Sequence, residues 1–264
     1  ISWKMGWAKE YMQTHAPGQD IRKVFQATIL YLEDKGDLMA TVKHYTFGAD
    51  SPVPKDLQTK LLKTAFTAIS FGARVSSTGW KNDSGQWTNP AIVDILKNSE
   101  DRQRFLADAT VKAFIAEQTL LDDYLYEKVK RERADLLKLP FLQTASGRPS
   151  KSKILSYLYQ HDETEIMNVV RAVAQQYGRE PLASIHDAIV FRKKLGVDIK
   201  HEMELTMREY SGNPYWHLTA KELQRYAPRL LDVEAEEAAH RSRIFAEEQF
   251  AQTYATAVRE ALEE

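Results

Sequence analysis

The chain has 264 residues and balances 36 Lys and Arg against 37 Asp and Glu, which gives a formal net charge of −1 at pH 7. Hydrophobic residues make up 43% of it and charged residues 28%, as in globular proteins. No apolar run approaches the roughly 18 residues of a membrane span. The chain contains no cysteine, which excludes disulfides and thiolate metal sites and leads us to expect a cytoplasmic protein.

The chain begins with Ile1 rather than Met, and we therefore expect that part of the natural protein precedes it. The first residues, ISWKMGWAKEYM, do not read as a signal peptide, because they lack a continuous apolar stretch.

Positive charge is concentrated in three short segments, although the whole chain is close to neutral. Such segments can neutralise nucleic-acid phosphates locally, and they are equally typical of a solvated surface. The clusters are Lys128, Lys130, Arg131 and Arg133, then Arg148, Lys151 and Lys153, then Arg192, Lys193 and Lys194.

The first half of the chain predicts mainly helices. Residues 24–33 are largely apolar and predict a helix that ends at Asp34. Residues 56–70 carry apolar side chains at helical spacing, with Asp56 as the expected N-cap. Residues 78–90 are rich in Gly, Asn, Asp and Pro and predict a loop, and residues 91–137 predict two or three helices.

Pro140 interrupts this helical region, and residues 144–153 predict a polar loop or connection. Residues 162–165, DETE, have the form of a capping box and predict the start of a helix. Apolar residues at helical spacing follow as far as Tyr177, and Gly178 is the expected C′ residue.

Residues 182–191 are short, apolar and rich in β-branched side chains, and they predict two strands around a His-Asp turn. Residues 199–210 and most of the last 45 residues predict helix. The predicted fold class is therefore α+β, mainly helical, with one small antiparallel β-hairpin. The segments do not alternate as βαβ units, which argues against a doubly wound sheet.

Asp187 stands at the centre of this hairpin, where an acid is unusual. A carboxylate on a tight turn suits Mg²⁺, which binds one or two carboxylates together with substrate phosphates. The alternative is a turn aspartate that caps backbone amides, which is a common role.

Lys63 lies in the predicted helix of residues 56–70, and Phe71 follows its last residue, eight positions after Lys63. At helical spacing, the two side chains lie within about 80° of each other around the axis. A cation and an aromatic ring on one face, followed by Gly72, can hold a triphosphate and a base together. The alternative is a buried amphipathic helix with a solvated lysine and a glycine cap.

In this order, the segments resemble motifs of the phage-type single-subunit DNA-directed RNA polymerases and their relatives, the family A DNA polymerases. The fingers helix of that superfamily reads Arg-x3-Lys-x7-Tyr-Gly, and Lys63 with Phe71-Gly72 matches its Lys and aromatic-Gly spacing. LASIHDAIVF, residues 182–191, matches the palm hairpin that bears His-Asp. YQHDETEIMNVVRAVAQQYG, residues 159–178, stands where the family places the helix before that hairpin.

The resemblance covers residues 56–194 and implies a right-hand polymerase. Residues 1–150 would then form the fingers and adjoining palm helices, and residues 151–264 the palm with its catalytic hairpin and C-terminal helices. It implies DNA-directed RNA synthesis with a DNA template, ribonucleoside triphosphates, an RNA product and Mg²⁺. If the protein is a phage enzyme, its expected location is the host bacterial cytoplasm.

The resemblance assigns roles to matching residues. Asp187 would bind the two catalytic Mg²⁺ ions, which activate the 3′ hydroxyl and stabilise the leaving pyrophosphate. His186 would support the end of the growing strand or orient the hairpin. Lys63 would contact the incoming triphosphate, and Phe71 would stack near the nascent base pair, with Gly72 allowing close approach of the backbone.

The same resemblance bears on several further positions. The family's Arg is replaced by Thr59, and Lys60 would substitute for it. Gln160 or His161 would touch the minor-groove edge of the primer–template. Thr67 stands where family A DNA polymerases carry a bulky aromatic residue, which favours an RNA enzyme.

The aromatic residue of the fingers motif is Phe71 rather than Tyr. In the RNA polymerases, the hydroxyl of that Tyr helps to discriminate ribose from deoxyribose. Sugar selectivity is therefore not fixed by the motif, and a DNA polymerase is an alternative.

The family also requires a second catalytic Asp upstream of the fingers helix. Asp20 is a candidate metal ligand, but no apolar strand precedes it. We favour a second Asp on residues before Ile1 or on a partner subunit, as in phage enzymes of this family that are split into two chains.

A third hypothesis is a helical nucleic-acid-binding or structural subunit without catalytic activity, in which the His-Asp turn is only a cap. Trp80 and Trp87 flank the polar loop of residues 78–90. They would either stack on a base or anchor the loop to the core.

Overall fold

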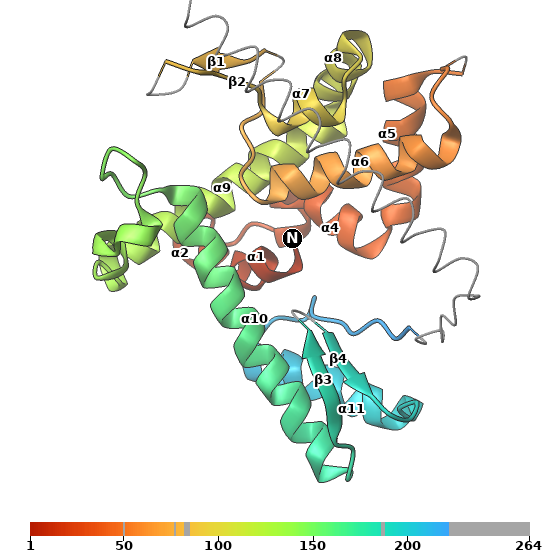
Figure 1. The fold of residues 1–264 in the computed structure, drawn as a ribbon, viewed down its shortest axis with the longest axis vertical. Coiled ribbons are helices and arrows are strands. Elements are labelled where there is room, and N and C mark those ends of the chain that lie inside the picture. Colours follow the sequence, from red (N-terminus) through yellow and green to blue (C-terminus); the bar gives the residue numbers. More distant parts are fainter. Residues whose placement is uncertain (50, 77, 82–84, 186–187, 222–264) are drawn as a thin grey trace, which may run out of the picture. The chain divides into compact units, whose positions relative to one another are not determined.

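The computed structural model describes residues 1–49, 51–76, 78–81, 85–185 and 188–221, without the side chain of Ile185. The chain divides into two compact units, residues 1–218 and 219–264. The fold of the first unit is shown in Figure 1. The helix predicted for the last 45 residues falls almost entirely on residues 222–264, which lie outside the described residues.

The N-terminal part of the first unit is helical. Its elements are α1 (Ser2–Gly6), α2 (Ala8–His15), α3 (Ile21–Val24), α4 (Gln26–Glu33), α5 (Lys35–Phe47) and α6 (Lys55–Ser70). The next elements are β1 (Trp80–Lys81), β2 (Trp87–Thr88), α7 (Ala91–Ile95), α8 (Ser99–Ala107) and α9 (Ala109–Glu132). The remaining elements are η1 (Leu136–Lys138), η2 (Pro140–Leu142), α10 (Lys151–Gln176), β3 (Pro181–Ile185), β4 (Ala188–Phe191) and α11 (Val197–Ser211).

The described residues are mainly helical with small antiparallel strand pairs, which confirms the predicted fold class at this level. The β1–β2 pair was not predicted, because it lies in residues 78–90, which were expected to form a loop. The three helices α7, α8 and α9 agree with the prediction for residues 91–137. Within the described part of the chain, none of the helices combines the length and hydropathy of a membrane-spanning segment.

Several predicted boundaries are wrong. The capping box at residues 162–165 does not start a helix, because α10 begins at Lys151 and continues through it. The Asp162 carboxylate does not cap a helix end and instead accepts a hydrogen bond from the indole N–H of Trp3. Asp56 was expected to be the N-cap of α6, but the N-cap is Pro54. Asp56 lies in the first turn of the helix, where an acidic side chain also stabilises the positive end of the helix dipole. The predicted helix of residues 24–33 is broken at Phe25.

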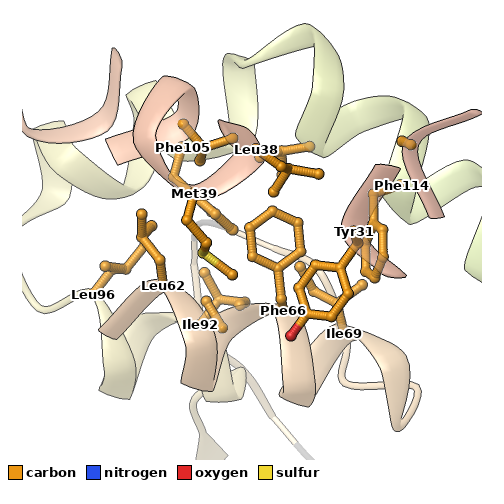
Figure 2. Close-up of a cluster of buried hydrophobic side chains, with 14 of the residues drawn as sticks. Tyr31, Leu38, Met39, Leu62, Phe66, Ile69, Ile92, Leu96, Phe105 and Phe114 are labelled. Carbon is orange, nitrogen blue, oxygen red and sulfur yellow. The ribbon is translucent and has the colours of Figure 1, made fainter. Parts of the chain in front are cut away.

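The main hydrophobic cluster packs around the inner face of α6 (Figure 2). The Phe66 ring is fully buried and lies with its centroid 4.9 Å from that of Phe114 and 5.8 Å from that of Phe105, both in edge-to-face geometry. Tyr31 from α4 packs against the same ring at 5.3 Å. Aromatic contacts thus fix α6 against α4, α8 and α9.

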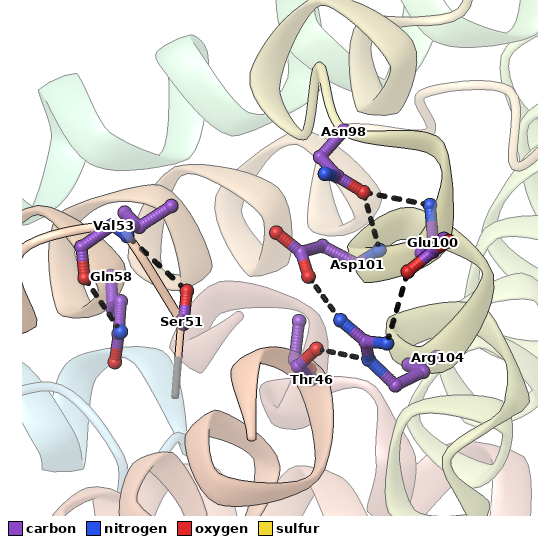
Figure 3. Close-up of polar contacts among 8 residues, drawn as sticks. All are labelled: Thr46, Ser51, Val53, Gln58, Asn98, Glu100, Asp101 and Arg104. Atoms are coloured by element: carbon purple, nitrogen blue, oxygen red, sulfur yellow. Dashed lines mark hydrogen bonds and ion pairs between the residues drawn. The ribbon is translucent and has the colours of Figure 1, made fainter. Parts of the chain in front are cut away.

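Polar contacts fix the turns around this cluster (Figure 3). Asn98 caps α8 by accepting hydrogen bonds from the backbone N–H groups of Glu100 and Asp101, at 2.8 and 3.1 Å. Arg104 donates from Nε to the carbonyl oxygen of Thr46 at 2.7 Å and pairs with Asp101. This arginine therefore ties the end of α5 to α8.

A separate cluster lies around the C-terminal half of α10. Val170 and Val173 of α10 pack with Met203 and Met207 of α11, and the partly buried Ile189 of β4 contacts the same cluster. The N-terminal half of α10 instead belongs to clusters shared with α9. Figure 1 shows α10 running from α9 to the β3–β4 hairpin, so one helix links the two packing regions.

The packing of α6 leads to a stability prediction. Replacing Phe66 by Ala removes a fully buried ring from between three aromatic neighbours, and we expect it to lower the free energy of unfolding by roughly 3–5 kcal/mol. Denaturant unfolding followed by circular dichroism measures this change. The control is Phe141→Ala, whose side chain is 60% exposed and whose loss should cost less than about 1 kcal/mol. Equal losses for the two variants would contradict the packing described.

Candidate functional site

The outer face of α6 carries the predicted fingers residues. Lys60, Lys63 and Thr67 are exposed along it, and Phe71 follows as the C-cap with its side chain 55% exposed. The opposite face buries Leu62 and other apolar residues in the main cluster. Lys63 and Phe71 thus lie on one exposed stripe, as their spacing predicted. Among the described residues, neither Lys60 nor Lys63 forms an ion pair.

The helix ends in a glycine turn directly after Phe71. Gly72 has φ +76°, and its N–H donates to the carbonyl oxygen of Ile69 at 2.9 Å. Ala73 N–H donates to Ala68 O at 2.9 Å, which completes the Schellman pattern. Glycine is required here by the positive φ. Gly178 ends α10 in the same way, with φ +63°, and confirms the predicted C′ residue.

An aromatic junction connects the end of α6 to α10. The Phe71 ring lies edge-to-face with the ring of Tyr159, with centroids 5.8 Å apart. Trp3 of α1 contacts the same tyrosine at 5.8 Å, and its Nε1 donates to Asp162 Oδ2 at 2.7 Å. We call Trp3, Phe71 and Tyr159 the aromatic junction.

The predicted minor-groove residues Gln160 and His161 follow Tyr159 directly on α10, and both are exposed. The structure therefore brings the end of the fingers-like helix into contact with α10 one residue before these positions.

Two cavities lie at this junction. One, of about 380 Å³, is lined by Phe71, Tyr159 and Lys35 among others. The other, of about 550 Å³, is lined by Gly72, Arg74, Lys151 and the start of α10. Asp122, Ser152 and Leu155 line both. Aromatic and cationic groups thus line two neighbouring cavities beside the end of α6.

A buried ion pair lies between the cavities. Lys4 of α1 pairs with Asp122 of α9, and both side chains are at most 7% exposed. Burial lowers the pKa of Lys4 and raises the pKa of Asp122, and the charge of each partner opposes the shift of the other. A Cβ atom added to Gly72 would lie 3.7 Å from Asp122 Oδ2, so the ion pair lies beside the glycine turn.

The strands of the predicted hairpin pair in antiparallel register, with Ala183 opposite Val190, Ser184 opposite Ile189 and Ile185 opposite Ala188. His186 and Asp187 join these strands in the sequence but lie outside the described residues. Arg171 of α10 donates from Nε to Ser184 Oγ at 3.2 Å, so β3 is attached to α10 near the predicted catalytic residues. The predicted strands are confirmed, and the roles of His186 and Asp187 stay predictions.

Asp20 acts as a helix cap in the structure. Its Oδ1 accepts a hydrogen bond from Arg22 N–H at 2.9 Å at the start of α3, and its side chain is exposed. Within the described ranges, no three His, Asp or Glu side chains are grouped so that they could hold a metal ion. Asp20 therefore belongs to no metal-binding group of that kind among the described residues, and its role as a metal ligand stays a prediction.

The basic cluster at the end of α9 is largely paired with acids. Lys128 contacts Glu10 at 2.5 Å and Glu132 at 3.3 Å, and Lys130 contacts Glu127 at 2.6 Å. Such pairing is typical of a solvated surface rather than of a phosphate-binding stripe. In the second cluster, Lys151 pairs with Asp123.

Sequence reasoning did not assign Lys4, Asp122, Trp3 or Tyr159 to the site. A signal for Asp122 exists, because it lies on the buried face of α9 beside Leu121 and Leu125, and an acid on an apolar face indicates a buried partner. Nothing in the sequence indicates which residue that partner is.

We expect Asp122→Asn to lower the free energy of unfolding by roughly 3–5 kcal/mol, because it leaves the Lys4 ammonium buried and unpaired. Denaturant unfolding measures the loss. Asp123→Asn is the matched control, since Asp123 is 65% exposed and its pair with Lys151 lies at the surface, so its loss should stay below about 1 kcal/mol. The double variant Lys4→Met with Asp122→Leu should recover most of the stability. A single variant as stable as the control would contradict this role.

Comparison with known protein families, curated proteins and solved structures finds no match for this chain. The functional assignment therefore depends on its own residues and on the geometry described above.

Proposed function

We propose that this chain supplies the fingers helix and the His-Asp hairpin of a DNA-directed RNA polymerase. The observation that carries the proposal is the contact between Phe71 and Tyr159. It joins the end of α6, with its exposed lysine stripe, to the helix that leads into the β3–β4 hairpin. Three segments that match polymerase motifs in order along the sequence are thereby connected in one compact unit.

The described side chains have properties that suit these roles. The Lys63 ammonium is exposed and can meet a triphosphate without first breaking an ion pair among the described residues. Phe71 offers a ring that is more than half exposed at the edge of a cavity, as stacking on a base pair requires. Lys60 lies three positions before Lys63 on the same exposed stripe of α6 and adds a second positive charge to that stripe.

Mg²⁺ is the expected cofactor, and Asp187 is the residue of this chain that would hold it. When bound, the ions would activate the 3′ hydroxyl and stabilise the leaving pyrophosphate. No apolar strand precedes Asp20, which instead caps α3, and we therefore propose that the second carboxylate comes from residues before Ile1 or from a partner subunit.

A DNA polymerase is the second candidate, because Phe71 lacks the hydroxyl that helps the RNA enzymes to select ribose. Thr67 supports RNA synthesis instead, since a small exposed side chain stands one turn before Phe71. Comparing incorporation of ribonucleotides and deoxyribonucleotides by the complete enzyme distinguishes the two.

The catalytic role of the hairpin is tested by Asp187→Asn in the complete enzyme, with any partner subunit, a DNA template, ribonucleotides and Mg²⁺. Loss of a metal-binding carboxylate should lower template-directed incorporation by at least about 10³-fold. Unfolding curves establish whether the variant still folds. Full activity of a folded Asp187→Asn enzyme would refute the assignment and favour a non-catalytic nucleic-acid-binding subunit.

The role of α6 is tested by Lys63→Ala. We expect kcat/KM for ribonucleotide incorporation to fall by about 10²-fold, because a charge that stabilises the reacting triphosphate is lost. Lys112→Ala is the control, since Lys112 is an exposed lysine on α9 away from the stripe, and its activity should match that of the unmodified enzyme. Equal activities of the two variants would argue against a triphosphate contact at Lys63.

A further inference from the structure

The larger of the two cavities lies where the start of α10 meets the turn that follows α6. Its volume is about 550 Å³, which falls within the range of roughly 300–1,000 Å³ that small-molecule sites occupy. Residues 72–75, the middle of α9 and the first turn of α10 line it. We call it the α10 cavity. Neither Lys63 nor Phe71 is one of its lining residues, so the roles proposed above leave it without a function.

The N-terminus of α10 lies at this cavity. Ser150 is the N-cap, but its side chain caps no N–H group, and the first turn contains no acid. Ser150, Lys151 and Ser152 all line the cavity. The first N–H groups of a helix have no acceptor within it, and here they carry the positive end of the dipole of a 26-residue helix. An anion in the cavity would therefore meet free hydrogen-bond donors and a favourable dipole.

A buried amide in the cavity wall points to a ligand independently of the helix. Gln118 is 1% exposed, and its Oε1 atom has no hydrogen-bond partner among the described residues. Its Nε2 donates to Thr28 Oγ1 at 3.0 Å, and Thr28 is not a lining residue. The oxygen is thus the end of the amide that is left for the cavity. A buried acceptor without a partner is costly, and an O–H or N–H group of a bound ligand would satisfy it.

Asp122 places a second acceptor beside Gln118. The two residues lie one turn apart on α9, so that their side chains share a face, and both are buried. Asp122 Oδ1 pairs with Lys4, whereas Oδ2 lies 3.7 Å from the position of a Cβ atom on Gly72. Gly72 and Asp122 both line the cavity. The buried wall therefore offers two oxygen acceptors to a ligand that carries hydroxyl or amine groups.

Positive charge lies at the more exposed part of the cavity. Arg74 is exposed and Lys151 half-buried, and both line the cavity. Lys151 is already paired with Asp123, but Arg74 forms no ion pair within the described ranges. The Arg74 guanidinium stacks on Trp80, 4.3 Å from the ring centroid. Stacking occupies the face of a guanidinium and leaves the N–H groups at its edge for an anion.

We propose that the α10 cavity binds a small phosphate monoester that carries hydroxyl groups. The phosphate would bind at the N-terminus of α10 beside Arg74, as anions commonly do at helix N-termini. The hydroxyl groups would donate to the oxygens of Gln118 and Asp122. Inorganic phosphate alone would leave these buried acceptors unpaired. The proposal does not rest on the proposed function, because no residue of the exposed lysine stripe takes part.

Ribose 5-phosphate is the probe, because it combines a phosphate with hydroxyl groups and has no base that could stack on Phe71. Isothermal titration calorimetry with the full chain, at low salt and without Mg²⁺, measures its binding. We expect it to bind at least about tenfold more tightly than inorganic phosphate or ribose, which corresponds to ~1.4 kcal/mol.

The helix N-terminus is tested by Ser152→Asp. The added carboxylate would repel the phosphate, but it stabilises the positive end of the helix dipole. We therefore expect ribose 5-phosphate binding to weaken by at least about tenfold without a fall in the unfolding midpoint. Val197→Asp is the matched control, because Val197 is 84% exposed in the first turn of α11, whose N-cap Gly196 also lacks a side-chain cap. This control should bind like the unmodified chain, whereas Arg74→Gln should weaken binding by about fivefold.

The buried end of the site is tested by Gln118→Leu. Loss of the unpartnered oxygen should weaken ribose 5-phosphate towards the affinity of inorganic phosphate, and the affinity of inorganic phosphate itself should not change. Unfolding curves establish that the variant folds, and if it does not, Ser152→Asp and Arg74→Gln still decide the outcome.

The proposal is overturned if the unmodified chain binds no ribose 5-phosphate, if Ser152→Asp binds it as tightly as Val197→Asp does, or if inorganic phosphate binds equally well. Lys63→Ala separates the α10 cavity from the triphosphate contact, because this variant should bind ribose 5-phosphate normally. A binding loss in Lys63→Ala would place the probe on the outer face of α6 and also overturn the proposal. Normal binding by a complete enzyme that incorporates no nucleotides would refute the polymerase assignment alone.

Discussion

The ion pair between Lys4 and Asp122 is the constraint on which the geometry of the candidate site depends. Burying two charges is costly unless their geometry is good, and these two groups meet only when α1 lies against α9. The glycine turn after Phe71 packs beside Asp122, and the start of α10 lines the cavities on either side of it. The ion pair itself contributes little to the free energy of unfolding. It does disfavour arrangements in which α1 and α9 are apart, because one of the two charges would then be buried without its partner.

The two ends of helix α10 pack against different helices. Its first turns pack against α9 through Ile154 and Leu155, and its last turns pack against α11 through Val170 and Val173. Between them stand Tyr159 and Asp162, which are held by α1 and the end of α6. Since a helix is stiff over this length, the position of its middle relative to α6 also determines where its C-terminal end presents the β3–β4 hairpin.

Local patterns in the sequence predicted local structure well. The apolar spacing of α6 placed Lys63 and Phe71 on one exposed face, and Gly178 was expected at the end of a helix because only glycine adopts that backbone angle readily. A short apolar run rich in β-branched residues predicted the two strands of the β3–β4 hairpin. The capping-box prediction failed for a physical reason, because a cap motif inside a longer helix can use its acids for other partners. Asp162 binds an indole 159 positions away, and no local pattern contains that information.

The contacts that build the site are long-range, and this is why sequence reasoning missed them. The Trp3–Tyr159 and Phe71–Tyr159 contacts join residues far apart in the chain. The spacing of apolar residues in one sequence predicts which face of a helix or strand is buried, but not which residue packs against it. The same limit applies to Trp87, whose sequence context fitted both a core anchor and a residue that stacks on a base. Its exposure in the structure excludes the core anchor.

The described residues do not locate the second carboxylate that the resemblance to polymerases requires. Asp20 was the candidate within the chain, but its carboxylate already accepts a backbone hydrogen bond at the start of α3, and release from that cap would cost about 0.5–2 kcal/mol of helix stability. A catalytic metal ligand must be held with its oxygen atoms free and grouped with other donors. Asp20 is exposed, caps a short helix and, within the described ranges, belongs to no group of three His, Asp or Glu side chains, so nothing in its surroundings favours it as a metal ligand.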